Sequence, residues 1–549
     1  MLFRKKRQWD VECDVLVVGS GAAGLTAALA AHEAGAQVAL IEKSDKIGGA
    51  SAVSGGVLWV PNNHHMGEIG ISDSREEAVR YATRLADGRG DNELIETFVD
   101  KSPEMLRFVE GETGLNFTSL ARYPDYHPEF EGGKGGGRSL DPGLFDSNDL
   151  GEWKSKLRRS PIFGMTALTV TEATEWGVFA KPLNLPFKLL GERLSKGFVC
   201  YGGALVGQLL KALLQRAIAP LMSFRARELI IEDGRVIGVR GEQSGAERSI
   251  RARKAVILTS GGFEWDRSLN SQFLSGQLTH PNSPPCNEGD GLRMAMVVGA
   301  ALGNMTEAWW CPSLMIPGEE YDGKQLNRAD FATRSLPHSI IVNRNGNRFV
   351  NEAQNYNDVM KPFFAFDSAS YERPNLPAWL IVDANHISKY GLLTVMPGKA
   401  VPSFVSRGET VSELASVIGV NAARLEATVR NFNRFAVEGV DPEFHRGESL
   451  YDRFYGDPDQ KPNANLGAIE KAPFYAVEVH AGSIGTKGGV KVNKNGEAIR
   501  ADGAVIRGLY AAGNVMAGPF GSGYPGAGST IGIAMTFGFL AGRKAASDA

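Results

Sequence analysis

Residues 14–43, DVLVVGSGAAGLTAALAAHEAGAQVALIEK, decide the fold of this chain. The run VLVV predicts a short buried strand, the alanine-rich stretch after it predicts a helix, and VALI predicts a second strand. The glycine turn GSGAAG separates the first strand from the helix, and Glu42 follows the second strand. A strand, glycine turn, helix and second strand that ends on an acid form the pattern of a dinucleotide-binding unit.

Each glycine of the turn has a physical reason. Gly19 permits the tight turn, Gly21 lets the backbone approach a pyrophosphate, and Gly24 lets the helix pack closely on the strand. The helix N-terminus offers unpaired N–H groups to the anion. Glu42 would accept hydrogen bonds from ribose hydroxyls and repel a 2′-phosphate. The alternative is a glycine turn that serves packing alone, and it does not account for the acid at this spacing.

A second glycine cluster follows at once, GGAS in residues 48–51 and SGG in residues 54–56. A single nucleotide half-site does not need it, whereas FAD carries an isoalloxazine beyond the pyrophosphate and needs backbone access to that ring. The sequence therefore favours non-covalent FAD over NAD, with a plain turn-rich loop as the alternative. The expected cofactor contacts are Gly19, Ser20, Gly21, Ala23, Gly24, Glu42, Lys43, Gly49, Ala50, Ser51, Gly55, Gly56, Ser260, Gly261, Gly513, Asn514, Thr530 and Ile531.

Length, net charge and cysteine spacing limit the classes of protein to which this chain can belong. A chain of 549 residues exceeds a single core and predicts two or more domains. The formal net charge of −3 argues against a nucleic-acid partner, which would favour a basic chain. The four cysteines lack CxxC or metal-ligand spacing, so we expect reduced thiols and no metal site; they are Cys13, Cys200, Cys286 and Cys311.

Two features bear on location. The first ten residues, MLFRKKRQWD, are basic but lack the apolar core of a signal peptide. No uncharged apolar run reaches the roughly 18 residues of a membrane span, because Lys211 and Arg216 interrupt the best candidate at residues 203–222. The sequence predicts a cytoplasmic protein that does not cross a membrane.

The character of the chain changes in its middle. Between residues 314 and 482 the glycine turns thin out, and mixed strands such as residues 339–343 alternate with amphipathic helices such as residues 422–435. This change predicts an inserted α+β catalytic, or capping, domain. The fold class expected is α/β, with a Rossmann-like FAD-binding domain whose two parts cover residues 1–313 and 483–549.

Residues 152–198 form the most unusual stretch of the chain, and we expect them to be a membrane-associating insertion. Tryptophan, phenylalanine and leucine alternate there with lysine and arginine, and Pro182 and Pro186 break the run. Such a surface suits contact with anionic lipid without crossing it, on the inner face of the cell membrane. A lid over the substrate or a contact with another subunit would bury the same residues. The sequence leaves these three interpretations open.

The assembled motifs resemble the succinate dehydrogenase/fumarate reductase flavoprotein superfamily and, within it, the 3-ketosteroid Δ1-dehydrogenases (3-oxosteroid 1-dehydrogenases). The likeness runs over nearly the whole chain. Its most specific parts are YPDY at residues 123–126, NEAQNYND at 351–358, EFHRGE at 443–448, GTKGG at 485–489 and GYPGAG at 523–528.

This resemblance implies a catalytic set. Tyr356 matches the tyrosine that removes the C2 proton, and Tyr126 matches the tyrosine that assists this base. Tyr524 and the backbone N–H of Gly528 match the pair that binds the C3 carbonyl oxygen. Two donors aimed at that oxygen stabilise the developing enolate, and the flavin N5 takes the hydride. The implied partners are a 3-ketosteroid and an external electron acceptor such as a quinone.

Other functions remain open at this point. A relative could desaturate the Δ4 position of 5α-3-ketosteroids. A fumarate or urocanate-type reductase is disfavoured because His338 and Arg348, the nearest candidates for its substrate clamp, lack the matching context. A non-enzymatic, flavin-binding, membrane-associated protein is the third alternative. The sequence does not identify the electron acceptor, the C17 substituent of the steroid or the oligomeric state, and Trp309 and Trp310 fit either the substrate cleft or the core.

Overall fold

The predicted dinucleotide unit is present in the structure, a computed structural model that describes residues 8–548. The strands β1 and β2 pair in parallel, and the helix α1 connects them; their bounds are Val11–Val18, Val38–Ile41 and Ala22–Glu33. A Cβ at Gly24 would lie 2.0 Å from Gly19 O, so only glycine lets α1 pack this closely on the turn. The basic residues 1–7, on which the absence of a signal peptide was predicted, lie outside the described residues.

This unit belongs to a sheet whose strands come from both ends of the chain. The order is β2-β1-β10-β21-β20, and the first four strands run parallel; the three further strands are β10 (Ala246–Leu258), β21 (Val505–Ala511) and β20 (Glu497–Ile499). The chain therefore returns to the nucleotide-binding sheet after residue 483, as predicted. The helices α14 (Ser529–Ser547) and α7 (Tyr201–Gln215) pack against α1.

A hairpin extends the same sheet. The strand β8 (Phe224–Glu232) pairs with β9 (Arg235–Gln243), and β9 pairs with β10. Asp233 and Gly234 connect them with φ values of 48° and 72°, which is the left-handed backbone that a two-residue type I′ turn requires. The Asp-Gly pair therefore fixes this hairpin.

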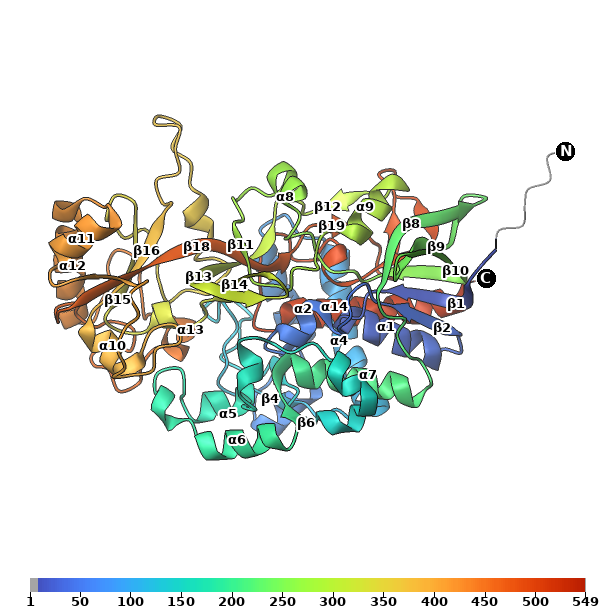
Figure 1. The fold of residues 1–549 in the computed structure, drawn as a ribbon, viewed down its shortest axis with the longest axis horizontal. Helices are drawn as coiled ribbons and strands as arrows, with labels where there is room; N and C mark the ends of the chain where they lie inside the picture. The colour runs from blue at the N-terminus through green and yellow to red at the C-terminus, as the bar shows by residue number, and fades with distance from the viewer. Residues whose placement is uncertain (1–7, 549) are drawn as a thin grey trace.

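A second sheet is formed by strands between residues 308 and 486 (Figure 1). Its order is β14-β13-β18-β16-β15, all antiparallel, with bounds Lys324–Ala329, Ala308–Tyr321, Phe474–Thr486, Ala378–Val382 and Ser339–Asn343. The helices α11 (Val411–Ile418) and α12 (Ala422–Glu438) cover its far end. The domain limits predicted at residues 314 and 482 fall inside β13 and β18, which pair with each other.

Residues 152–198 form a short helical layer at the lower edge of the molecule in Figure 1, built from α5 (Val170–Glu175), the 3-10 turn η4 (Pro182–Asn184) and α6 (Phe187–Ser195). Leu168, Ala173 and Leu190 form a small core of their own here. Three apolar side chains of this layer are exposed, Leu183 at 67%, Phe187 at 60% and Leu189 at 38%. Among residues 8–548, no helix combines the length and apolar character that a membrane span requires.

Candidate active site

A single large cavity connects the glycine turn after β1 to a group of tyrosines. Every residue predicted to contact the cofactor lines this cavity except Gly24, which packs α1 on the turn instead. The four residues of the implied catalytic set, Tyr126, Tyr356, Tyr524 and Gly528, line it as well. The structure thus brings together two groups of residues that the sequence identifies separately.

The nucleotide end of the cavity fits FAD. The N-terminus of α1 opens into it, and a Cβ at Gly49 or Gly55 would meet no atom within 4 Å, so the backbone borders open space there. Ser260 Oγ is buried without a hydrogen-bond partner among the described residues and lines the same space. Glu42 lies at this end, where its carboxylate accepts from Ser20 N and Ser20 Oγ at 3.1 and 2.5 Å. Glycine turns, a helix N-terminus and an acid are the donor and acceptor set that a dinucleotide uses.

Three tyrosines from three separate loops meet at the other end. Tyr126 follows β4 (Thr118–Ser119), Tyr356 follows β15, and Tyr524 precedes α14. Their ring centroids lie 5.4 Å apart for Tyr126 and Tyr356, 4.9 Å for Tyr126 and Tyr524, and 5.5 Å for Tyr356 and Tyr524. Gly528, at the N-cap of α14, has a φ of 96°, and a Cβ there would lie 2.4 Å from Val57 O.

The hydroxyl groups have distinct partners. Tyr524 Oη accepts from Tyr356 Oη at 2.9 Å and from Thr530 Oγ1 at 3.1 Å, so its own hydrogen can donate toward the cavity. Tyr126 Oη is buried and has no partner among the described residues, which leaves one phenolic donor unused. Burial raises the pKa of the Tyr126 and Tyr356 phenols well above the ordinary value, so neither loses its proton readily in this state.

Buried charges fix the loop of Tyr126. Asp125 accepts from Trp59 Nε1 and from Arg138 Nη1, both at 2.7 Å, and Arg138 also pairs with Asp73 at 2.6 Å. Tyr126 N donates to Pro525 O at 3.0 Å, which joins this loop to the turn that carries Tyr524. The aspartate of the YPDY motif therefore has a structural role, because it holds the loop in place.

His127 joins the loop of Tyr126 to the loop of Tyr356. Its Nε2 lies 2.7 Å from Asp358 Oδ2, and its Nδ1 lies 2.9 Å from Glu129 Oε1. Burial disfavours the imidazolium, but the hydrogen bonds to Asp358 and Glu129 prevail and raise the pKa of His127 to about 9. At neutral pH the charged and largely buried ion pair of His127 with Asp358 therefore fixes the distance between these two loops.

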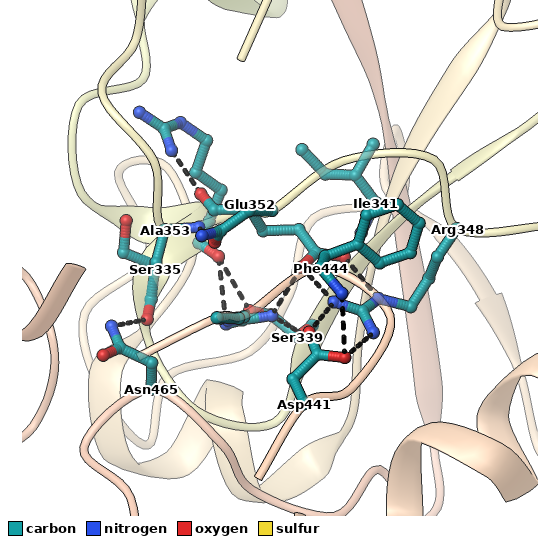
Figure 2. A network of polar contacts seen from close by, with 12 residues as sticks. Ser335, Ser339, Ile341, Arg348, Glu352, Ala353, Asp441, Phe444 and Asn465 are labelled. Carbon is teal, nitrogen blue, oxygen red and sulfur yellow. Dashed lines mark hydrogen bonds and ion pairs between the residues drawn. The ribbon is translucent and has the colours of Figure 1, made fainter. Parts of the chain in front are cut away.

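A buried charge network anchors the NEAQNYND loop four residues before Tyr356 (Figure 2). Arg348 contacts Glu352 at 2.7 Å and Asp441 at 2.8 Å, and Arg446 of the EFHRGE motif reaches Glu352 at 3.2 Å. Burial opposes the charge of Glu352, but Arg348 and Arg446 keep the pKa of this carboxyl below its ordinary value. Figure 2 also shows Ile341, whose backbone N–H donates to Glu352 at 3.0 Å. Two of the specific motifs therefore meet here to position the loop of the proposed base.

Lys487, in the GTKGG motif, was not predicted as a site residue. Its Nζ donates to Ser522 O at 2.7 Å, Gly523 O at 3.1 Å and Asn357 Oδ1 at 3.1 Å, so it ties the turn of Tyr524 to the neighbour of Tyr356. Burial, with a contribution from Lys361, lowers the pKa of Lys487 to about 7. The GTKGG motif could have indicated this role, because a lysine buried beside glycines at a strand end needs acceptors nearby.

Several other candidates lie outside the cavity. Arg348 is enclosed in its ion pairs, and His338 contacts Ala468 O at 2.7 Å; neither lines the cavity. Trp310 is 1% exposed and belongs to a core cluster. Trp309 packs on the Tyr524 ring at 4.6 Å, so it supports the site from outside the cavity.

Apolar side chains form much of the cavity wall, beside polar ones such as Gln325 and Asn327. The apolar part includes side chains from the 152–198 layer and from β14 and its following loop, namely Ile162, Phe163, Val170, Ala173, Phe179, Leu326 and Phe331. Among the described lining residues, the only lysine or arginine is Lys43, at the nucleotide end, where Asp290 and Glu288 hold its ammonium at 2.7 and 3.2 Å. A charged ligand group beside the phenols would therefore find no counter-ion in the wall.

Comparisons with known proteins agree with this geometry. The family model described as FAD binding domain matches residues 14–531. A 4-oxocyclohexanecarboxylate 2-dehydrogenase from Sinomonas cyclohexanicum is 42% identical over 544 residues, which cover 98% of this chain and 93% of that protein. A 3-oxosteroid 1-dehydrogenase from Mycolicibacterium smegmatis is 38% identical over 565 residues, which cover 98% of each. The crystal structure of a 3-ketosteroid delta1-dehydrogenase from Sterolibacterium denitrificans, in complex with 1,4-androstadiene-3,17-dione, has a TM-score of 0.90 and 36% identity, with coverage of 98% of this chain and 99% of that chain.

Proposed function

Because the chain belongs to the family of FAD-binding flavoenzymes that includes the 3-oxosteroid 1-dehydrogenases, we propose that it desaturates the C1–C2 bond of 3-ketosteroids. One observation carries this proposal: a single cavity joins residues that fit FAD to three phenols and a wall rich in apolar side chains. Bound FAD supplies the acceptor for the C1 hydride, and an external acceptor such as a quinone reoxidises it. Residues of this chain bind the carbonyl oxygen and remove the C2 proton.

Tyr524 and the backbone N–H of Gly528 hold the C3 carbonyl oxygen. Loss of the C2 proton places negative charge on this oxygen, and two fixed donors in a site that excludes water stabilise that charge. The hydrogen bond that Tyr524 Oη accepts from Thr530 Oγ1 at 3.1 Å supports this role, because it leaves the phenolic hydrogen of Tyr524 for the ligand. Gly528 supports it as the N-cap of α14, where a backbone N–H is unpaired within the helix.

Tyr356 takes the C2 proton. A phenolate is a strong base when burial raises its pKa, but the same burial makes the phenolate scarce. Tyr126 stabilises the Tyr356 phenolate, because its unpartnered hydroxyl can donate a hydrogen bond to that anion. An uncharged set of phenols also suits a steroid, since a buried carboxylate without a partner would be costly.

The relative that acts on 4-oxocyclohexanecarboxylate favours a second candidate substrate, a single-ring keto acid. The same proton and hydride losses beside a ketone would desaturate it. Its carboxylate, however, would enter a wall in which the described residues offer no lysine or arginine near the phenols. Burial of an unpaired carboxylate costs several kcal/mol. The apolar side chains of Phe163 and Phe179 instead fit a large uncharged ring system.

Anaerobic reduction of the bound flavin tests this choice. Androst-4-ene-3,17-dione is expected to bleach the flavin absorbance rapidly and to give a product with a new C1 vinyl proton in its NMR spectrum. 4-Oxocyclohexanecarboxylate is expected to react far more slowly at equal concentration. Faster bleaching by the keto acid would overturn the steroid assignment. A panel of 3-ketosteroids that differ at C17 then ranks the side chains that the cavity accepts.

The same experiment separates the remaining alternatives. Desaturation of a 5α-3-ketosteroid at C4 would give a C4 vinyl proton in place of the C1 signal. A fumarate-type reductase would oxidise reduced viologen with a dicarboxylate, and we expect no such turnover because His338 and Arg348 lie outside the cavity. A protein whose flavin stays oxidised with every 3-ketosteroid would be a binding protein, not an enzyme of this class.

We further infer that the layer of residues 152–198 rests on anionic lipid. Its inner side lines the cavity through Phe163 and Phe179, and its outer side exposes Leu183, Phe187 and Leu189. The exposed Lys188 and Lys196 lie on and just after the same short helix, α6. Apolar side chains flanked by lysines are the usual surface of a peripheral membrane protein. A water-insoluble steroid could then pass from lipid to the cavity through one layer of the protein.

Replacing both Leu183 and Phe187 by serine is expected to release the protein from vesicles of anionic lipid. Burial of one such side chain contributes about 1.5–3 kcal/mol, so the double variant should bind at least about tenfold more weakly. Co-sedimentation with vesicles measures the bound fraction. The matched control replaces Val297 and Val437, exposed at 86% and 76%, by serine and should bind as the wild type does. Equal sedimentation of both double variants would contradict lipid contact through this layer.

A further inference from the structure

A histidine pair and a glutamate converge outside the active site. His64 and His65 begin the 3-10 turn η1 (His64–Ile69), and Glu110 lies in the last turns of α4 (Asn92–Thr113). His64 Nε2 lies 3.0 Å from Glu110 Oε2, and His65 Nε2 lies 2.6 Å from Glu110 Oε1. The two imidazole rings face each other, with centroids 4.1 Å apart and planes tilted by 38°.

The spacing of these groups would allow them to hold a metal ion. One ligand atom from each of the three residues lies within 4.8 Å of the others, and this is the group of that kind found among residues 8–548. The other nitrogen of His65, Nδ1, lies 3.2 Å from Glu68 Oε1. A carboxylate on the far side of a ligating histidine fixes the ring and its tautomer, as in many zinc sites.

We propose that His64, His65 and Glu110 bind a divalent transition metal ion, zinc or a close relative. Two imidazoles and one carboxylate suit zinc, cobalt or nickel, whereas magnesium and calcium prefer oxygen ligands alone. Three protein ligands leave a fourth tetrahedral position to water, and the His64 side chain, 31% exposed, lies where an ion can enter. Glu110 and Glu68 together balance the charge of the ion.

The bound ion would fasten the loop after β3 (Leu58–Trp59) to the end of α4. Asn63 already ties this loop inward, because its Nδ2 donates to Val60 O at 2.8 Å and to Gly137 O at 3.0 Å. None of the three ligands lines the cavity. The ion therefore stabilises the fold and takes no part in the reaction proposed above. A test of the metal site and a test of the dehydrogenase activity are thus independent of each other.

Titration of the flavin-loaded, chelator-treated protein tests the site. Zinc chloride in a calorimeter is expected to bind with a stoichiometry of one at this site, and cobalt chloride is expected to give the visible bands of a tetrahedral ion. Zinc should also raise the melting temperature by mass action, since the site exists only in the folded chain. Glu110→Gln and His64→Gln each remove a ligand and should abolish the cobalt bands and the thermal shift.

Glu68→Gln is the more discriminating variant. It removes the carboxylate behind His65 but no ligand, so zinc affinity is expected to fall by about 10- to 100-fold while cobalt keeps its tetrahedral spectrum. Turnover should match the wild type in all of these variants, which also shows that they fold and hold FAD.

Two controls identify binding elsewhere. His445 is 70% exposed and pairs with Glu448 at 3.1 Å, and the described residues offer no third ligand there, so His445→Ala should leave zinc binding unchanged. His280 and His480 form a stacked histidine pair elsewhere, with ring centroids 3.8 Å apart, beside Glu478. Zinc binding that survives Glu110→Gln, or that disappears when His280 and His480 are both replaced by alanine, would overturn the proposal. Absence of any binding by the wild type would do the same.

Discussion

Tyr356→Phe is expected to lower the rate of flavin reduction by a 3-ketosteroid by about 10²- to 10⁴-fold, the usual contribution of a positioned general base. The substitution removes the one oxygen proposed to accept the C2 proton and keeps the ring that packs on Tyr126 at 5.4 Å. Steroid binding should therefore persist while the chemical step slows. Anaerobic stopped-flow mixing, followed by flavin absorbance, separates the limiting rate from the apparent affinity.

Tyr455→Phe is the matched control. Tyr455 is buried, lines the same cavity and shares a hydrogen bond of 2.6 Å with Tyr123, but it lies outside the group of three phenols. Its variant should react at close to the wild-type rate. A similar loss in both variants would mean that phenols support packing or binding here, and Tyr356 would lose its assignment as the base.

The pH dependence of the limiting rate adds a second check on the same residue. Burial raises the pKa of Tyr356 above its ordinary value, so the phenolate is the minor form through the neutral range. Its fraction, and with it the rate, should grow by up to about tenfold per pH unit until that pKa is reached. In Tyr356→Phe this rise should disappear. A wild-type rate that falls with increasing pH would exclude a phenolate base.

Much of the nucleotide-binding half could be predicted because its signals are local. A β-branched run, the glycines after it and an alanine-rich helix occupy 30 consecutive residues, and each acts through backbone geometry that neighbours in the sequence determine. The hairpin at Asp233 and Gly234 is equally local. The cofactor contacts follow from these turns, which explains why nearly all of the predicted ones line the cavity.

The phenol cluster could not be predicted from local pattern. Tyr356 and Tyr524 are 168 positions apart in the sequence and meet only in the folded chain. Motif resemblance identified these tyrosines, whereas propensity and periodicity did not. The GTKGG motif marked Lys487 but not its role, since its three acceptors come from two distant loops. The choice among lid, lipid contact and subunit contact for residues 152–198 depends on burial and partners that no local signal encodes.

Tyr524→Phe is expected to lower the limiting rate by about 10²- to 10³-fold, the loss measured when one donor of an oxyanion site is removed. Phenylalanine keeps the ring contact with Trp309 at 4.6 Å and removes the hydrogen that faces the cavity. The ketone is a weaker acceptor than the enolate, so steroid affinity should fall much less than the rate. The backbone N–H of Gly528 remains and limits the loss.

Thr530→Val removes a donor to Tyr524 at 3.1 Å without removing the phenol, so its effect should be smaller. A rate unchanged in Tyr524→Phe would mean that the carbonyl oxygen is held elsewhere in the cavity.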